Sequence, residues 1–205
     1  MKKLFADRPK IHLIAVLVCS GLAALTFFNT DLSAKTDSRE MDRLFSIMGV
    51  INVPPTNDPV RINLKDIKGK NISLSDFKGK IVFLNFWTTW CPTCRIEVPS
   101  MEKLHQKFKN KDFAMVTVNL RESASKVKAF FKKFKLTFTA LLDSTGEVGA
   151  SFGIRAIPTT YILDKTGRII GRVNGPREWD SKAAIALFEN LMDKDVVAGT
   201  SKAAN

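Results

Sequence analysis

A chain of 205 residues with 45% apolar and 25% charged residues has the composition of a globular protein, which excludes a disordered chain and a membrane protein with many spans. The formal net charge of +12 would suit nucleic acid, but no base-reading motif accompanies it, and the lysines are spread along helical stretches as on a solvated surface. Nucleic acid is therefore not expected as a partner, while attraction of this charge to anionic lipid or to an acidic protein stays open.

The first predicted element is a single N-terminal transmembrane helix. Residues 11–28 contain no Lys, Arg, Asp or Glu, and a helix of that length spans roughly 27 Å, close to the hydrocarbon thickness of a bilayer. Residues 1–10 are mainly basic, whereas charges of both signs follow the helix, so this N-terminus is expected to stay in the cytoplasm. A cleaved signal peptide is the alternative, but Leu32 fits poorly at the third position of a cut after Ala34.

A linker and a leading β-hairpin are expected next. Residues 29–59 begin polar, contain a short helical pattern near 41–48 and end in Val-Pro-Pro-Thr-Asn-Asp-Pro, which is typical of a linker, and the linker is assigned to 29–57. The folded domain is predicted over 58–193. Its first residues, 60–64 and 72–74, alternate apolar with polar around a glycine-containing turn, which predicts a hairpin.

Strands and helices alternate through the rest of the domain. Residues 81–87 form an almost continuous apolar run, as in a strand buried on both faces. The elements predicted after it, in chain order, are a helix over 92–108, a strand over 113–118, a helix over 123–134, a strand over 138–142, a hairpin of strands 159–163 and 169–173, and a helix over about 178–192. This order indicates an α/β fold, and residues 194–205 are expected to be a flexible tail.

Cys91 and Cys94 form a CxxC pair at the point where the strand 81–87 gives way to the following helix. This places Cys91 at a helix N-terminus, where free N–H groups and the helix dipole stabilise thiolate over thiol. Cys91 is therefore predicted to be the attacking sulfur. Cys94 lies one turn further in, close enough to resolve the mixed disulfide that Cys91 forms with a partner.

The alternative interpretation is that Cys91 and Cys94 are half of a zinc site. Such a site needs four ligands, and the remaining cysteine and histidines are Cys19, His12 and His105. Cys19 and His12 lie in the predicted membrane helix, as an apolar filler and an interfacial residue. His105 lies about three helical turns past Cys94. Redox chemistry is therefore favoured, and no metal is expected.

The run WTTWCPTCRIEVP over residues 87–99 resembles the active site of membrane-anchored thioredoxin-like proteins of the TlpA and ResA group. The resemblance extends through residues 118–123, 141–143 and 153–161, and it covers the chain from about 58 to 193. It implies a thioredoxin-like fold, with a central mixed sheet flanked by helices, and thiol–disulfide exchange with no cofactor beyond the redox-active cysteines. It also implies anchoring in a bacterial inner membrane, with the domain in the periplasm or outside the cell.

The resemblance implies a substrate-binding surface around the cysteine pair. Ile157–Pro158 is expected to be a cis peptide beside the cysteines, where the Ile157 backbone can pair with an extended substrate segment; base rates alone would favour an ordinary loop proline. Trp90, Pro92 and Thr93 are expected to line the same surface.

Two acidic residues are further candidates for the site. Glu97 matches an acid that lies close to the cysteines in the group, and burial would push its carboxylate towards neutrality, which makes it a candidate proton carrier. A solvated helix acid beside Arg95 is the alternative. Glu122 matches a second acidic position, although it also simply precedes a helix cap at Ser123.

The Pro-Thr pair between the cysteines also resembles the cytochrome c maturation thioredoxins. It implies reduction of protein disulfides, such as those of the haem-binding cysteines of apocytochromes c, with electrons from a membrane thiol transporter. A disulfide oxidase or isomerase stays open, because thioredoxin-like potentials span about 150 mV. A non-enzymatic copper carrier would use CxxxC and a distant histidine rather than CxxC. A thiol peroxidase is disfavoured because two tryptophans stand near Cys91 in place of the expected Pro and Thr pattern.

Overall fold

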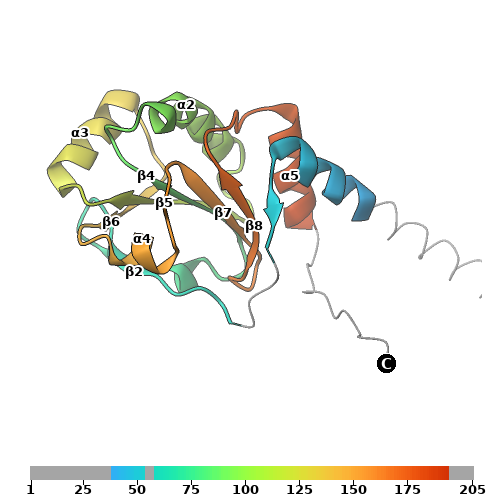
Figure 1. Cartoon of the computed structure of the whole chain (residues 1–205), viewed down its shortest axis with the longest axis horizontal. Coiled ribbons are helices and arrows are strands. Elements are labelled where there is room, and N and C mark those ends of the chain that lie inside the picture. The colour runs from blue at the N-terminus through green and yellow to red at the C-terminus, as the bar shows by residue number, and fades with distance from the viewer. Residues whose placement is uncertain (1–37, 54–57, 194–205) are drawn as a thin grey trace, which may run out of the picture. The chain divides into compact units, whose positions relative to one another are not determined.

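The structure is a computed structural model that describes residues 38–53 and 58–193 (Figure 1). Its contacts divide the chain after Asp42 into two units, and the described part of the first unit, residues 38–42, is helical. Within the described ranges, no helix is both long and apolar enough to cross a membrane. The predicted basic N-terminus (1–10), transmembrane helix (11–28) and C-terminal tail (194–205) lie outside the described residues.

A mixed six-stranded sheet in the order β1-β8-β7-β4-β5-β6 forms the centre of the second unit. Its strands are β1 (Ile51–Asn52), β4 (Ile81–Trp87), β5 (Phe113–Leu120), β6 (Thr139–Asp143), β7 (Thr159–Leu163) and β8 (Ile169–Asn174). β4 pairs parallel with β5 and antiparallel with β7, in a register that sets Phe86 opposite Thr159. All of β4 is buried, as expected for a central strand covered on both faces.

The two faces of β4 pack against different elements. On one face, Phe83 lies edge-on to Trp179, with ring centroids 4.7 Å apart, and Trp87 lies 5.0 Å from Phe130. The helices over this face are α2 (Pro92–Lys107), α3 (Ala124–Phe134) and α5 (Lys182–Asp193). Figure 1 shows α2 and α3 on the side of the sheet opposite α4 (Glu147–Ser151) and β2 (Asn63–Lys65).

The other face of β4 packs against the leading hairpin and α4. Val82, Leu84 and Phe86 join a hydrophobic cluster that includes Leu74 and Val148. The hairpin consists of β2 and β3 (Asn71–Ser73), which pair antiparallel, and the short 3-10 helix η1 (Leu74–Phe77) follows it. The predicted hairpin is therefore confirmed, and it packs over one face of β4.

Part of the segment predicted as a linker belongs to the folded unit. Residues 38–48 are helical, as the pattern there indicated, and Leu44 and Met48 are buried. β1 then adds an edge strand beside β8. A strand of two residues is too short to show an alternating pattern, so the sequence did not reveal it. The compact unit thus begins at Arg43 rather than at residue 58.

Two other elements differ from prediction. α4 was not predicted, because its five residues are too few to show helical periodicity. α5 starts at Lys182, not near Glu178, because the preceding residues form a turn in which the Ser181 N–H donates to the Glu178 carbonyl at 3.2 Å. That turn directs Trp179 into the core. The other strands and helices predicted within residues 58–193 are confirmed, with ends displaced by a few residues.

Candidate active site

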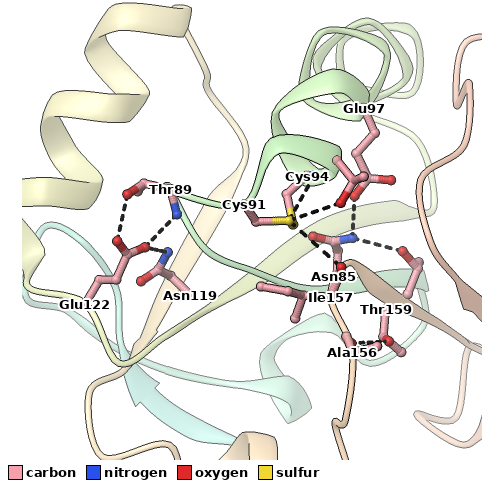
Figure 2. Close-up of a disulfide and its surroundings, with 12 residues drawn as sticks. Asn85, Thr89, Cys91, Cys94, Glu97, Asn119, Glu122, Ala156, Ile157 and Thr159 are labelled. Carbon is pink, nitrogen blue, oxygen red and sulfur yellow. Dashed lines mark hydrogen bonds between the residues drawn. A yellow bond between two sulfur atoms is a disulfide. The ribbon is translucent and has the colours of Figure 1, made fainter.

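The cysteine pair lies where β4 ends and α2 begins, in the form of a disulfide between Cys91 and Cys94 (Figure 2). Cys91 is the N-cap of α2, and the Cys94 N–H donates to Cys91 Sγ at 3.1 Å. Pro92 occupies the first helical position, where its fixed φ and missing N–H are tolerated. Because N–H donation and the positive end of the helix favour a sulfur anion, this geometry favours the thiolate of Cys91 after reduction.

The Cys91 sulfur faces the loop that precedes β7. Cys91 Sγ lies 3.9 Å from the Ile157 carbonyl oxygen and 3.3 Å from Thr93 Oγ1. The Ile157–Pro158 bond is cis, as the resemblance implied. Cys91 itself is only 3% exposed. A partner sulfur can therefore reach it only by coming into contact with its neighbours.

The other residues predicted for substrate binding border the same sulfur. Trp90, Pro92 and Thr93 are exposed, Ile157 is half-buried and Pro158 is buried. The structure thus brings together at the disulfide all five residues predicted for this surface. Their part in binding stays a prediction.

Glu97 is buried on the inner side of α2, with 2% of its surface exposed. Its Oε1 accepts from Asn85 Nδ2 at 3.0 Å, and its Oε2 accepts from Trp179 Nε1 at 3.0 Å and from the Arg177 N–H at 3.4 Å. Burial raises the pKa of Glu97 to about 7, against the hydrogen bonds and the nearby Arg177 charge, which lower it. The alternative of a solvated acid beside Arg95 is therefore wrong.

Asn85 ties this acid to the central sheet. It is fully buried in β4, and its Nδ2 also donates to Thr160 Oγ1 of β7 at 2.9 Å. Asn85 Oδ1 has no hydrogen-bond partner among the described residues. Sequence reasoning missed both Asn85 and Trp179. A signal existed for Asn85, because it is the one amide in the apolar run of residues 81–87.

Glu122 lies on the other side of the disulfide from Glu97, next to the loop that leads into Cys91 (Figure 2). Its carboxylate accepts from the Thr89 N–H at 2.6 Å and from Thr89 Oγ1 at 2.7 Å. Asn119 Nδ2 donates to it at 2.8 Å, and Lys126 Nζ lies 2.7 Å away. Burial alone would raise the pKa of Glu122, but the hydrogen bonds from Lys126 and Thr89 outweigh it and hold that pKa below its usual value. This arrangement suits an ionised anchor for Thr89 better than a proton carrier.

Glu122→Gln is expected to lower the free energy of unfolding at pH 7 by about 2 kcal/mol, because an amide NH₂ would face buried donors. A carboxylate whose folded-state pKa is depressed stabilises the fold above its unfolded pKa, and this stabilisation is lost as the pH falls through the lower folded value. The difference between wild type and variant should therefore shrink below about pH 4. Urea unfolding at pH 7 and at pH 3 measures it. Glu147→Gln, at an exposed acid, is the control, and a pH-independent difference would contradict the expectation.

The surroundings of His105 bear on the alternative of a zinc site. Within the described ranges, no group of three or more His, Cys, Asp or Glu side chains is placed to hold a metal ion. His105 instead packs edge-on against the ring of Phe138, with centroids 6.2 Å apart.

A mixed sheet with helices on its faces, a CxxC disulfide at a helix N-terminus and a facing cis-proline loop define a thioredoxin-like thiol–disulfide oxidoreductase. The family model described as Redoxin matches residues 53–187, and the chain belongs to this family. It is a ResA-like member: it is 41% identical over 175 residues to the thiol-disulfide oxidoreductase ResA of Bacillus cereus, covering 85% of this chain and 91% of the relative. The ResA of Bacillus subtilis is 36% identical over 151 residues, covering 74% and 83%.

Solved structures agree with this assignment. StoA from Bacillus subtilis is similar with a TM-score of 0.54 and 34% identity, over 66% of this chain and 98% of that one. A putative thiol:disulfide interchange protein DsbE from Chlorobium tepidum is similar with a TM-score of 0.61 and 28% identity, over 67% and 97%. The predicted α/β thioredoxin-like fold and the enzyme class are therefore confirmed.

Proposed function

We propose that this protein reduces disulfides of extracytoplasmic proteins by dithiol exchange through Cys91 and Cys94. The observation that carries the proposal is the Cys91 sulfur at the N-terminus of α2, which accepts from the Cys94 N–H and faces the Ile157 carbonyl. Disulfide exchange is favoured over the carriage of a metal ion, because the site holds sulfur and backbone groups arranged for exchange.

The reaction begins with the Cys91 thiolate, which attacks one sulfur of the substrate disulfide. A mixed disulfide forms and the other substrate sulfur leaves as a thiolate, which takes up a proton. Cys94 then loses its proton and attacks Cys91 Sγ, which releases the second substrate sulfur. The substrate gains two electrons and two protons as a dithiol, and the enzyme ends as the Cys91–Cys94 disulfide.

Glu97 is proposed to move the proton of Cys94 during this cycle. A carboxylate with a pKa of about 7 can both accept and release a proton near neutral pH. Glu97 lies on α2, the helix that carries Cys94. The ionised Glu122 is proposed to hold the loop before Cys91 and not to transfer protons.

The location and partners are proposed from the sequence. Residues 11–28 would anchor the chain in a bacterial inner membrane, and the unit from Arg43 onwards would work on the outer side, with electrons from a membrane thiol transporter. The Pro-Thr pair between the cysteines supports apocytochromes c, with their paired haem-binding cysteines, as substrates. An oxidase or isomerase is the second candidate, because the fold and the motif do not fix the potential.

A redox titration distinguishes these two directions of electron flow. The full chain in detergent would be equilibrated in glutathione and dithiothreitol buffers, and alkylation would report the thiol state of Cys91 and Cys94. We expect a reduction potential close to that of thioredoxin, about −270 mV. A value near about −120 mV would identify an oxidant and overturn the proposed direction.

A further inference from the structure

The outer surface of α2 carries a run of exposed apolar side chains that begins at the disulfide. Ile96 is 73% exposed and Trp90 is 63% exposed, more than any other large apolar side chain of the described residues. Pro92 and Pro99 are also exposed. Positions 92, 96 and 99 follow the spacing of one helix face, and Trp90 immediately precedes Cys91. These four residues, Trp90, Pro92, Ile96 and Pro99, are called the α2 apolar strip.

Folding does not account for this strip. The opposite side of α2 already packs into the core, through Cys94, Glu97, Val98, Met101 and Leu104. A helix at the surface needs one apolar face, and Ile has a lower helix propensity than the Lys or Glu usual at exposed positions. Exposed apolar side chains grouped along one helix face next to the disulfide are typical of an interaction surface.

The strip is continuous with the surface that any exchange partner must cover. Cys91 is almost buried, so a partner cysteine reaches its sulfur only when the partner chain lies against the first turn of α2. Ile96 follows Pro92 by four residues, which corresponds to about 6 Å along the helix axis. Two residues of an extended chain span about 7 Å. A side chain two positions from the partner cysteine therefore falls within reach of Ile96.

Cations border the strip on the side of α3. The Arg95 guanidinium lies 5.9 Å from the centre of the Phe134 ring, and Lys133 Nζ lies 5.8 Å from the same ring. α2 has no acidic residue in its first turn to offset them. A basic side chain in the partner would meet like charge here, whereas an apolar one would cover Ile96.

We propose that the α2 apolar strip docks protein partners that carry an apolar side chain two residues from the cysteine they exchange, and that Ile96 is the specificity-determining residue. This inference rests on the proposed function, because the partner is the disulfide-containing protein that Cys91 attacks. It defines the substrate class by local chemistry: an extended segment, apolar next to its cysteine and without a cation there.

Matched peptides test this preference. Each peptide forms a mixed disulfide with a chromophoric thiol and carries Leu or Lys two positions before, or two positions after, its cysteine. Of the two Leu peptides, the one that reacts faster with the reduced full chain in detergent should react about tenfold faster than the peptide with Lys at the same position. Ile96→Ser should lower the Leu rate about five- to tenfold and bring the Leu-to-Lys ratio close to one.

Two controls separate docking from chemistry. The reaction of the oxidised protein with dithiothreitol, and the reduction potential, should be unchanged by Ile96→Ser, because a small thiol does not reach the strip. Ile47→Ser, at an isoleucine that is 54% exposed elsewhere, should leave every rate unchanged. Sedimentation of both variants reports self-association.

Four results would overturn the inference. Equal wild-type rates for the Leu and Lys peptides would refute docking by the α2 apolar strip, but would leave the proposed reductase function standing. An equal loss of rate with peptide and with dithiothreitol in Ile96→Ser would place the effect in the chemistry. A change of association state in Ile96→Ser would make the strip a contact between copies of this chain. If the wild type exchanges with no peptide at all, the proposed function fails and the strip proposal fails with it.

Discussion

Cys94→Ser is expected to stop turnover and to accumulate the partner as a mixed disulfide on Cys91, whereas Cys91→Ser is expected to abolish exchange without trapping a partner. The asymmetry follows from the site, because Cys91 faces the Ile157 loop and Cys94 is fully buried behind it. Without Cys94 Sγ, no internal thiol can attack the mixed disulfide, and turnover should fall by at least about 1,000-fold.

Non-reducing gels followed by mass spectrometry of the trapped species measure this difference. Both variants would be made in a Cys19→Ser background, so that the third cysteine of the chain forms no adduct. Ile47→Ser, at an exposed isoleucine outside the active site, is the control and should turn over normally. Adducts in equal amounts on both variants would contradict the assignment of Cys91 as the attacking sulfur.

Glu97→Gln is expected to remove the pH dependence of exchange near pH 7 and to slow it about 100-fold there, as loss of a general acid–base group commonly does. The wild-type rate should show an inflection at the pKa of Glu97, about 7. Stopped-flow exchange from pH 5 to 9 measures both. An unchanged profile in the variant would exclude Glu97 as the proton carrier.

The same acid should influence stability with the opposite sign to Glu122. Its folded-state pKa is raised from 4.5 to about 7, so the folded state holds a proton that the unfolded state has released. Stability should therefore fall by about 3 kcal/mol as the pH rises from 4.5 to 7, and Glu97→Gln should flatten this slope. Trp179→Phe removes the indole N–H that lowers this pKa, so it should move the kinetic inflection above 7 without removing it.

The sequence predicted the parts of the fold that depend on local pattern. The buried strand at 81–87 and the helix start at Cys91 were both evident, because an apolar run and a CxxC pair are contiguous in the chain. Residues 43–48 and β1 were assigned to a linker because their packing partners lie elsewhere in the sequence. The prediction of a helix cap at Ser123 is also confirmed, because the Ser123 side chain accepts from the Lys126 N–H at 3.4 Å.

The environment of the two acids could not be predicted in the same way. Trp179 Nε1 reaches Glu97 across 82 residues, and the Thr89 N–H reaches Glu122 across 33. No local pattern encodes such contacts; they appear only after the sheet and helices assemble. The resemblance pointed to both acids, but only the structure distinguishes their protonation. Burial raises the pKa of Glu97 to about 7, whereas hydrogen-bond donors lower the pKa of Glu122 and keep it ionised.

The pairing of β4 with β7 has a consequence for how accurately the site is built. β4 ends just before the cysteines, β7 starts just after Pro158, and Phe86 stands opposite Thr159 in the ladder. A slip of one residue between these strands would carry the Ile157 carbonyl about 3.3 Å from its place beside Cys91 and turn its neighbours to the other face of the sheet. The position of the Cys91 sulfur relative to the Ile157 carbonyl thus depends on the hydrogen-bonded pairing of β4 with β7 in the middle of the sheet. Transfer of this activity to another scaffold would require both strands in register, since grafting the CxxC loop alone would leave the facing carbonyl unplaced.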